Sequence, residues 1–351
     1  MRTDLKRISV TVVSIAGVCA LLLTGFTMRM AVGGAITNQF KEISLYDAAA
    51  TFNADMLPEV EEEIESEIER AGAECLELYY APASFSVDGK LCAAKLIAGD
   101  LEKVRDYFAF GGAPDEYGLI INVRTSEKRN LAVGDTVTMY DDGMKPFEAK
   151  VVKTYDNYIG TEMLMSEESY KAVFGEYAKK NAYFIKGENV AQLGEKLKNI
   201  AGFVSFTDVG AVRDGYERMA SVLNVVAVLL TVVAGAMAYF ILLNLINMYI
   251  SQKKRELTIM RVNGFTVREV KNYVARESIA TTILGIAIGS VGGVMFAQRV
   301  VLLIETATSR FLREIQWPAV IAAIVITAGF IAAINAFALR KIRDLRLTDV
   351  Q

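Results

Sequence analysis

The chain has 351 residues, of which 53% are hydrophobic, and a formal net charge of -3. This length predicts more than one domain, and the hydrophobic content predicts a membrane protein with a sizeable soluble part. There is no His in the sequence. The chain therefore lacks the commonest general base and the commonest transition-metal ligand, which argues against many enzyme and metal-site classes.

Charge is distributed unevenly along the chain. Residues 34–217 carry 19 Lys and Arg against 33 Asp and Glu, a net charge of -14, whereas the remainder carries a net charge of +11. Such an asymmetry between parts of one chain predicts that they occupy two compartments.

Uncharged windows predict four transmembrane helices. They cover residues 8–28, 219–252, 278–298 and 315–339, and each is long enough to cross a bilayer, which takes about 20 residues. We place the first helix in residues 1–35 and the others at about 219–250, 275–304 and 317–340, within a membrane domain of residues 217–351. The first window is too long for a signal-peptide core and lacks a clean cleavage site, so we expect it to be retained.

Basic residues near the span ends set the expected orientation. They precede the first span, lie between the second and third, and follow the fourth: Arg2, Lys6, Arg7, Lys253, Lys254, Arg255, Arg261, Arg268, Lys271, Arg276, Arg340, Lys341, Arg343 and Arg346. All of these fall on one side of a four-span protein, and the positive-inside rule makes that side cytoplasmic. We therefore expect a multi-pass protein of the cell membrane with cytoplasmic termini and residues 36–216 outside.

The second uncharged window exceeds the length needed to span by about 14 residues, or about 21 Å of helix. Tilt absorbs part of this excess. We expect the rest to project outward as a stalk, with Arg29 to Phe40 as its partner. The alternative is that the outer part of this helix only caps the soluble domain.

The outer segment, residues 36–216, reads as an α+β domain. An α/β part is predicted from strands at 43–52, 75–87, 91–97, 183–185 and 203–206 and helices at 58–71, 101–108 and 190–200, with an Asp88-Gly89 hairpin turn. Residues 117–180 form a predicted β-rich insert. We find no cofactor or metal site: Asp141-Asp142-Gly143 has turn composition, and the acidic run Glu59 to Glu69 is interpreted as a solvated helix face rather than a binding site.

Two cysteines, Cys75 and Cys92, lie in this outer segment. An extracytoplasmic location permits a disulfide between them. Two unpaired thiols are the alternative, and the sequence leaves both open.

The segment Lys253–Phe265, KKRELTIMRVNGF, predicts a helical elbow on the cytoplasmic side. Leu257 and Met260 form an apolar stripe flanked by Arg255, Glu256 and Arg261. Asn263-Gly264 is a typical helix stop. After Phe265, the pair Thr266 and Glu269 has the spacing of a capping box that starts the next helix. An apolar stripe with mixed charge suits a groove on a partner protein; a lipid surface or a plain basic loop are the alternatives.

Gly285, Gly289 and Gly293 recur every four residues in the third span. Small residues at this spacing allow close helix approach. We predict a helix-packing seam, within the subunit or between subunits.

The stretch RELTIMRVNGFTVREVKNYVARESIATTILGIAIGSVGG resembles the signature of FtsX-like (MacB-type) ABC transporter permeases. The matching positions are Arg255, Glu256, Leu257, Ile259, Met260, Arg261, Gly264, Phe265 and the entry glutamate Glu277. The tail ALRKIRDLRLTDV is similar to the basic tail of the family but lacks its usual Pro and Ala-Leu-Arg ending. The similarity is greatest to the C-terminal module of long bacterial permeases, so the chain is either a four-span subunit or part of a longer permease.

The resemblance implies a non-catalytic permease subunit. No GxxxxGK[ST] motif is present, so the ATPase would be a separate cytoplasmic chain that pushes on Arg255, Glu256, Leu257, Met260, Arg261, Gly264 and Phe265. Family members couple ATP hydrolysis to movement of the outer domain, for export or extraction of lipid, lipoprotein or peptide. The implied partners are this ATPase, a second permease module, as a homodimer or as the other half of a longer permease, and the lipid bilayer, with no nucleic acid.

Two other function classes remain. One is a membrane signalling or scaffold protein whose outer domain regulates a partner such as a cell-wall hydrolase. The other is an ion-coupled carrier. An ion-coupled carrier usually has acidic or basic residues inside its membrane spans, and the uncharged windows of the four predicted spans have none, which weighs against the carrier.

Overall fold

The structure is a computed structural model that describes residues 2–87, 89–140, 144–262 and 265–343. Only the backbone is described for residues 2–7, 238, 241–262, 267–268, 270–275, 277–278 and 334–343. The chain divides into two compact units. Unit 1 comprises Met1–Val32, Ala220–Ile304 and Leu312–Gln351, and unit 2 comprises Gly33–Met219 and Glu305–Phe311.

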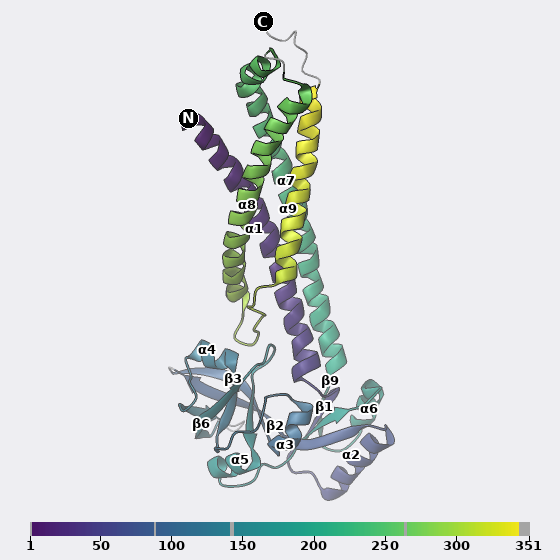
Figure 1. The fold of residues 1–351 in the computed structure, drawn as a ribbon. Coiled ribbons are helices and arrows are strands. Elements are labelled where there is room, and N and C mark those ends of the chain that lie inside the picture. Colours follow the sequence, from purple (N-terminus) through teal and green to yellow (C-terminus); the bar gives the residue numbers. More distant parts are fainter. Residues whose placement is uncertain (1, 88, 141–143, 263–264, 344–351) are drawn as a thin grey trace. The chain divides into compact units, whose positions relative to one another are not determined.

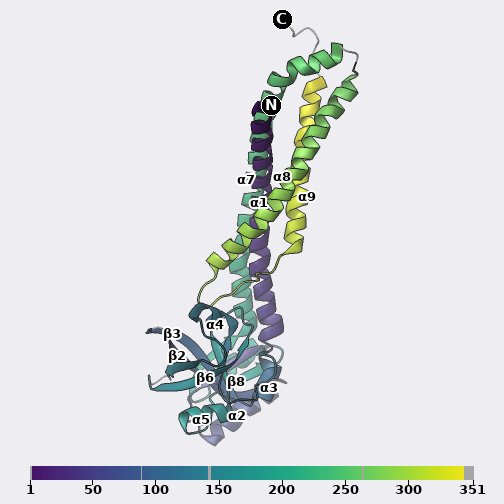
Figure 2. The same cartoon turned by 60° about the vertical axis from the view of Figure 1, so that its left-hand side comes forward.

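Unit 1 consists of long helices that lie side by side in both ribbon views (Figure 1 and Figure 2). They are α1 (Arg2–Asn38), α7 (Val209–Val262), α8 (Val267–Ile304) and α9 (Trp317–Arg343), and the outer ends of α1 and α7 belong to unit 2. Three described segments are long and apolar enough to cross a membrane: Ile8–Ile43, Val209–Met237 and Ile279–Ile304. Trp317–Ala333 of α9 is a shorter apolar helix, so the fourth span stays a prediction.

The core of unit 1 joins all of these helices. Its buried members come from each helix in turn: Ile15, Val18, Leu22, Leu23, Ala234, Ala297, Val320, Ala323 and Ile331. A small residue also makes room for a large side chain between two of the helices. A Cβ added to Gly235 on α7 would meet the Phe330 ring of α9 at 3.0 Å. The helices of unit 1 therefore pack as a bundle through their small and medium-sized side chains.

One half of unit 2 is a four-stranded antiparallel sheet in the order β2-β8-β1-β9. Its strands are the first part of β2 (Glu74–Val87), β8 (Ala182–Lys186), β1 (Ala48–Phe52) and β9 (Phe203–Asp208), and its helices are α2 (Pro58–Arg70) and α6 (Val190–Leu197). The order of elements is β-α-β-β-α-β, the ferredoxin-like arrangement. Ile64 and Ile68, one turn apart on α2, are fully buried against this sheet, while most of the glutamates of α2 are exposed.

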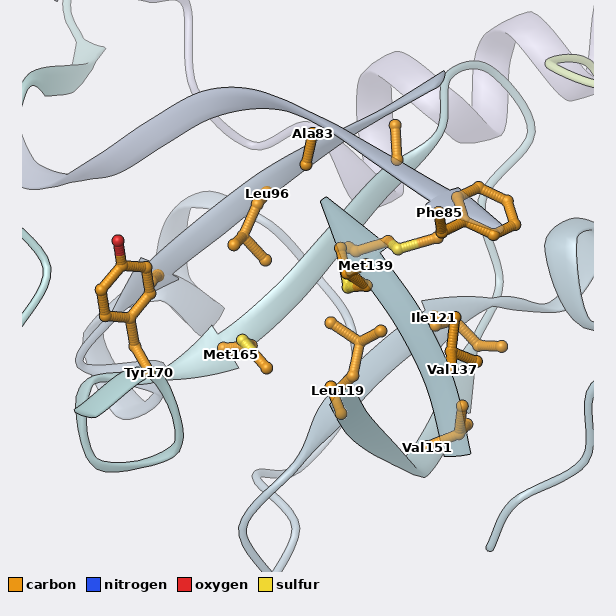
Figure 3. Packing of buried hydrophobic residues seen from close by; sticks show 14 residues of the cluster. Ala83, Phe85, Leu96, Leu119, Ile121, Val137, Met139, Val151, Met165 and Tyr170 are labelled. Atoms are coloured by element: carbon orange, nitrogen blue, oxygen red, sulfur yellow. The ribbon is translucent and has the colours of Figure 1, made fainter. Parts of the chain in front are cut away.

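The other half of unit 2 is a ring of six strands. The order β3-β7-β4-β6-β5-β2 is closed by the pairing of β2 with β3. The further strands are β3 (Lys90–Gly99), β4 (Leu119–Asn122), β5 (Thr136–Tyr140), β6 (Pro146–Tyr155) and β7 (Glu162–Ser166). Apolar side chains from all six strands fill the interior (Figure 3). Closure removes the free strand edges that an open sheet would expose.

The structure corrects two parts of the sequence interpretation. The strand predicted at 91–97 was assigned to the α/β part, but β3 pairs with β7 of the insert, and the second half of β2 pairs with β5. The strand predicted from Ile43 begins only at Ala48. A π-helical turn, η1 (Gln39–Ile43), ends α1 instead, and Ile43 is buried there in an apolar cluster. The apolar side chain of Ile43 is therefore buried from a helical turn and not from a strand.

Three short helices complete unit 2. They are α3 (Leu101–Tyr107), α4 (Val123–Arg129) and α5 (Glu167–Phe174). The first was predicted at 101–108. The other two were not predicted, and each begins with a side-chain cap: Asn122 Oδ1 accepts from Thr125 N at 2.7 Å, and Ser166 Oγ accepts from Ser169 N at 3.0 Å. Such caps satisfy amide groups that a short helix leaves without partners.

Candidate functional site: elbow, glycine seam and docked loop

The predicted cytoplasmic elbow lies around the end of α7 and the start of α8. Residues 255–261, with the proposed contacts Arg255, Glu256, Leu257, Met260 and Arg261, are helical in backbone, and their side chains lie outside the described part. The predicted stop at Asn263-Gly264 also lies outside the described residues. Phe265 is 45% exposed.

The capping box at the start of α8 is present. Thr266 N and Thr266 Oγ1 both donate to Glu269 Oε2 at 2.8 Å, and Glu269 N donates to Thr266 Oγ1 at 3.3 Å. These hydrogen bonds from Thr266 lower the pKa of the Glu269 carboxyl. The carboxylate therefore remains ionised at neutral pH and keeps both donors paired, so the first turn of α8 has a defined start.

The three predicted seam glycines of α8 face α1 within unit 1. A Cβ on Gly285 would lie 2.8 Å from the Ile15 side chain, and one on Gly293 would lie 2.9 Å from Ala20 Cα. At Gly289, the added Cβ would meet the Ala16 carbonyl oxygen at 2.7 Å. Any side chain at these positions would force the two backbones apart. The contacts belong to one chain, so this seam packs α8 on α1 inside the subunit.

The connection between α8 and α9 contributes a site that sequence analysis missed. Its residues Glu305–Phe311 belong to unit 2, although the helices on either side belong to unit 1. Glu305 Oε2 lies 2.8 Å from Arg124 Nη1 of α4, and the two side chains are 0% and 7% exposed. Arg124 Nε also donates to the Thr306 carbonyl at 3.0 Å. This connection, which we call the docked loop, is thus an integral part of unit 2.

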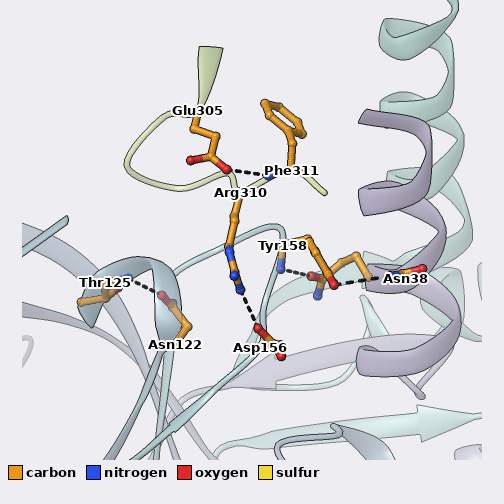
Figure 4. A network of polar contacts seen from close by, with 9 residues as sticks. Asn38, Asn122, Thr125, Asp156, Tyr158, Glu305, Arg310 and Phe311 are labelled. Atoms are coloured by element: carbon orange, nitrogen blue, oxygen red, sulfur yellow. Dashed lines mark hydrogen bonds and ion pairs between the residues drawn. The ribbon is translucent and has the colours of Figure 1, made fainter. Parts of the chain in front are cut away.

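The docked loop is also held near its far end. Phe311 N donates to Glu305 Oε1 at 3.1 Å, and Arg310 Nη1 lies 2.5 Å from Asp156 Oδ1 (Figure 4). The sequence showed only that Arg310 and Arg313 are the basic residues between the last two spans. A Glu directly after an apolar run was the one available signal, and it does not identify the partner.

The cysteines of unit 2 are both unpaired in the structure. Cys92 stands opposite Phe85 in the β2–β3 pair, and Cys75 lies ten residues before Phe85 on β2. About 30 Å of strand therefore separates the thiols, whereas a disulfide requires Cα atoms within about 7 Å. The open question from the sequence is resolved against a bridge within this chain.

Two further acidic features were considered from the sequence, the helix Pro58–Arg70 and the turn Asp141-Asp142-Gly143. Within the described residues, no group of three or more acidic or Cys side chains is placed to hold a metal ion. Glu67 of α2 accepts from Arg70 and lies 3.4 Å from Lys196 Nζ. These two cations lower the pKa of Glu67, the Arg70 hydrogen bond having the larger effect. Asp141-Asp142-Gly143 lies outside the described part.

Comparison with protein families gives a match in the C-terminal part of the chain. Residues 225–346 match the family described as FtsX-like permease C-terminal. None of the functionally curated proteins matches the chain. Among solved structures, the extracellular domain of the noncanonic ABC-type transporter YknZ from Gram-positive bacteria is similar at 14% identity and a TM-score of 0.28, covering 46% of this chain and 98% of that one.

Proposed function

Because residues 225–346 match the FtsX-like permease C-terminal family, we propose that the chain is the permease subunit of an ABC transporter that works with a separate cytoplasmic ATPase. The family match is the observation that carries this proposal. The lack of a P-loop motif in the sequence supports a division of labour in which another chain binds ATP.

The ATPase docks, in this proposal, on the elbow formed by Arg255, Glu256, Leu257, Met260 and Arg261 with Gly264 and Phe265. The capped start of α8 supports this role, because a helix whose first turn is held by side-chain hydrogen bonds frays less when a partner pushes on it. The basic residues around the elbow support its cytoplasmic side by the positive-inside rule.

In this proposal, ATP hydrolysis by the partner is coupled to movement of the outer domain. The helix α7 continues without a break from Val209, in unit 2, to Val262 at the elbow. A continuous helix of this kind transmits displacement along its axis. The cargo class we propose is lipid, lipoprotein or peptide, and a second permease module completes the transporter.

The proposed function is tested by co-purification of the full-length chain with its candidate ATPase. We expect a stable complex whose ATPase activity depends on the permease. Glu256→Ala and Gly264→Ala should weaken the complex, whereas Glu148→Gln, at an exposed position of β6, should not. A chain that binds no ATPase, or elbow variants that bind it as well as the parent does, would contradict the proposal.

A further inference from the structure

One loop of unit 2 is held by hydrogen bonds to two segments that continue from the membrane helices: the turn after α1 and the connection between α8 and α9. This β6–β7 loop, Asp156–Gly160, joins β6 to β7. On one side it contacts the end of α1, and on the other side it contacts the docked loop, Glu305–Phe311. All of these residues belong to unit 2.

The first grip is made by Gln39, which begins the π-helical turn after α1. Gln39 is 3% exposed, and its Oε1 accepts from Tyr158 N at 2.9 Å and from Ile159 N at 3.0 Å. Its Nε2 donates to Ser44 Oγ at 3.1 Å, which fixes the orientation of the amide. Asn38 Nδ2 adds a contact to Tyr158 Oη at 3.4 Å. The N–H groups of Tyr158 and Ile159 thus share one acceptor, the buried side chain of Gln39.

The second grip is made by the backbone of the docked loop. Ile159 and Ser309 form an antiparallel bridge. Gly160 N donates to the Thr308 carbonyl at 2.9 Å, and Arg310 N donates to the Tyr158 carbonyl at 2.8 Å. The ion pair of Arg310 with Asp156 lies at the edge of this bridge. Backbone pairing fixes register as well as contact, so the two loops are held in one alignment.

The docked loop is in turn anchored away from the bridge. The buried pair of Arg124 and Glu305 lies at its start, where Arg124 also holds the Thr306 carbonyl. Opening this contact would separate two charges that are almost fully removed from water, which is strongly unfavourable. The anchor therefore favours a docked loop that stays closed.

We propose that the β6–β7 loop and the docked loop form a permanent clamp through which α1, α8 and α9 move the outer domain as one body. This inference rests on the proposed function, since it concerns how the permease passes movement outward. It adds the connection between the last two spans to the route through α1 and α7. The clamp transmits force because it stays closed during the ATP cycle.

A cysteine lock tests whether the clamp is permanent. Residues opposite one another in an antiparallel bridge have Cα atoms within the range that a disulfide spans. We therefore expect Ile159→Cys with Ser309→Cys to cross-link in the full-length chain without the ATPase, as detected by mass spectrometry of a non-reduced digest. Ile159→Cys alone should give no such peptide. Absence of the cross-link in the double variant overturns the clamp, whatever the proposed function.

The role in coupling is tested on the complex with the ATPase. The measurement is the difference in deuterium uptake by the outer domain between the ATP-bound and nucleotide-free complexes. We expect the locked protein to keep this difference and Glu305→Gln to lose most of it, because the variant loses the buried charge pair that anchors the docked loop. The control Glu314→Gln, at an exposed position, should match the parent. If the Glu305→Gln protein does not accumulate, Asp156→Asn, which removes the exposed partner of the Arg310 ion pair, should reduce the difference to a smaller extent.

The outcomes separate the two proposals. Loss of the nucleotide response on locking shows that the clamp has to open and overturns it, as does a full response in Glu305→Gln. A parent complex without any nucleotide response overturns the proposed function, and with it the role of the clamp in coupling, even where the cross-link forms.

Discussion

Arg124 and Glu305 form an ion pair of 2.8 Å in which neither side chain is more than 7% exposed. The pair joins a short helix in the β-rich part of the outer domain to the connection between the last two predicted spans. Buried ion pairs contribute little net stability compared with apolar packing, but removing one partner leaves an uncompensated charge. The pair is therefore suited to fixing one position of the docked loop rather than to adding stability.

This pair should behave as a unit in a double-mutant cycle. Arg124→Met and Glu305→Leu should each lower the free energy of unfolding of unit 2 by about 3–5 kcal/mol, because each leaves a buried charge. The double variant should cost much less than the sum of the two. Hydrogen exchange of α4 and β6 peptides in the full-length protein gives the measurement, and additive effects would contradict a buried pair.

Alanine substitution should affect stability differently at two neighbouring glycines of α8, because only one of them lies in the glycine seam. A Cβ on Gly289 would lie 2.7–2.9 Å from Ala16 and Cys19 of α1, whereas nothing lies within 4 Å of one on Gly292. Gly289→Ala should therefore destabilise the bundle by about 1–3 kcal/mol through overpacking. Gly292→Ala should be neutral or slightly stabilising, because Ala favours the helix. Thermal unfolding of the purified protein in detergent provides the comparison, and equal effects would exclude the seam.

The turn of the clamp at Gly160 should tolerate alanine less well than a matched glycine. Gly160 has φ +101° and Gly134 has φ +103°, so alanine meets the same backbone strain at both. Only at Gly160 would the new Cβ overlap the Glu162 carboxylate, which accepts from Asn157 Nδ2 at 3.0 Å. Gly160→Ala should therefore cost about 1 kcal/mol more than Gly134→Ala, the value of one hydrogen bond. Urea unfolding followed by hydrogen exchange tests this, and a smaller loss at Gly160 would refute it.

The two thiols of the outer domain should differ in reactivity. Burial, followed by the nearby charges of Glu65, Glu77 and Glu69, raises the pKa of Cys75 to about 11. Because the thiolate is the reactive form, Cys75 should be alkylated far more slowly than Cys92 at pH 8. Mass spectrometry of iodoacetamide-treated protein measures both rates, with Cys75→Ser and Cys92→Ser as assignments. Comparable rates in the folded protein would contradict the raised pKa.

The sequence was sufficient for features that depend on neighbouring residues. Helices at 58–71, 101–108 and 190–200 follow from local apolar spacing and end signals, and α2, α3 and α6 occur there within a few residues. The Thr266–Glu269 capping box is likewise local and is present. Apolar length alone indicated long helices in the membrane part.

Features that depend on distant residues were beyond one sequence. The closure of the six-strand ring requires β3 to pair with β7, more than sixty residues further along the chain, and strand periodicity carries no information about the partner. The pairing of Arg124 with Glu305 also joins residues far apart in the sequence, and nothing near either residue indicates its partner. The short helices α4 and α5 were missed because their caps, Asn122 and Ser166, are also common turn residues.

The carboxyl of Glu162 should make the outer domain less stable as pH rises. Burial raises its pKa above the ordinary value of 4.5, although its own backbone N–H, Lys95 and the hydrogen bond from Asn157 oppose this. The native state therefore binds more protons than the unfolded state between pH 4.5 and the raised pKa, so the free energy of unfolding falls as pH rises through that window. Above the window, the destabilisation is complete.

Glu162→Gln should remove this destabilisation while keeping an acceptor for Asn157. The variant should unfold at a higher temperature than the parent at pH 8 and at nearly the same temperature at pH 4, where the carboxyl is mostly protonated in both states. Glu148→Gln, on the exposed side of β6, is the matched control and should show no such difference between the two pH values. Thermal unfolding of the full-length protein at both pH values gives the comparison. A Glu162→Gln protein that is less stable than the parent at pH 8 would mean that the ionised carboxylate stabilises the β6–β7 loop, contrary to the direction of its pKa.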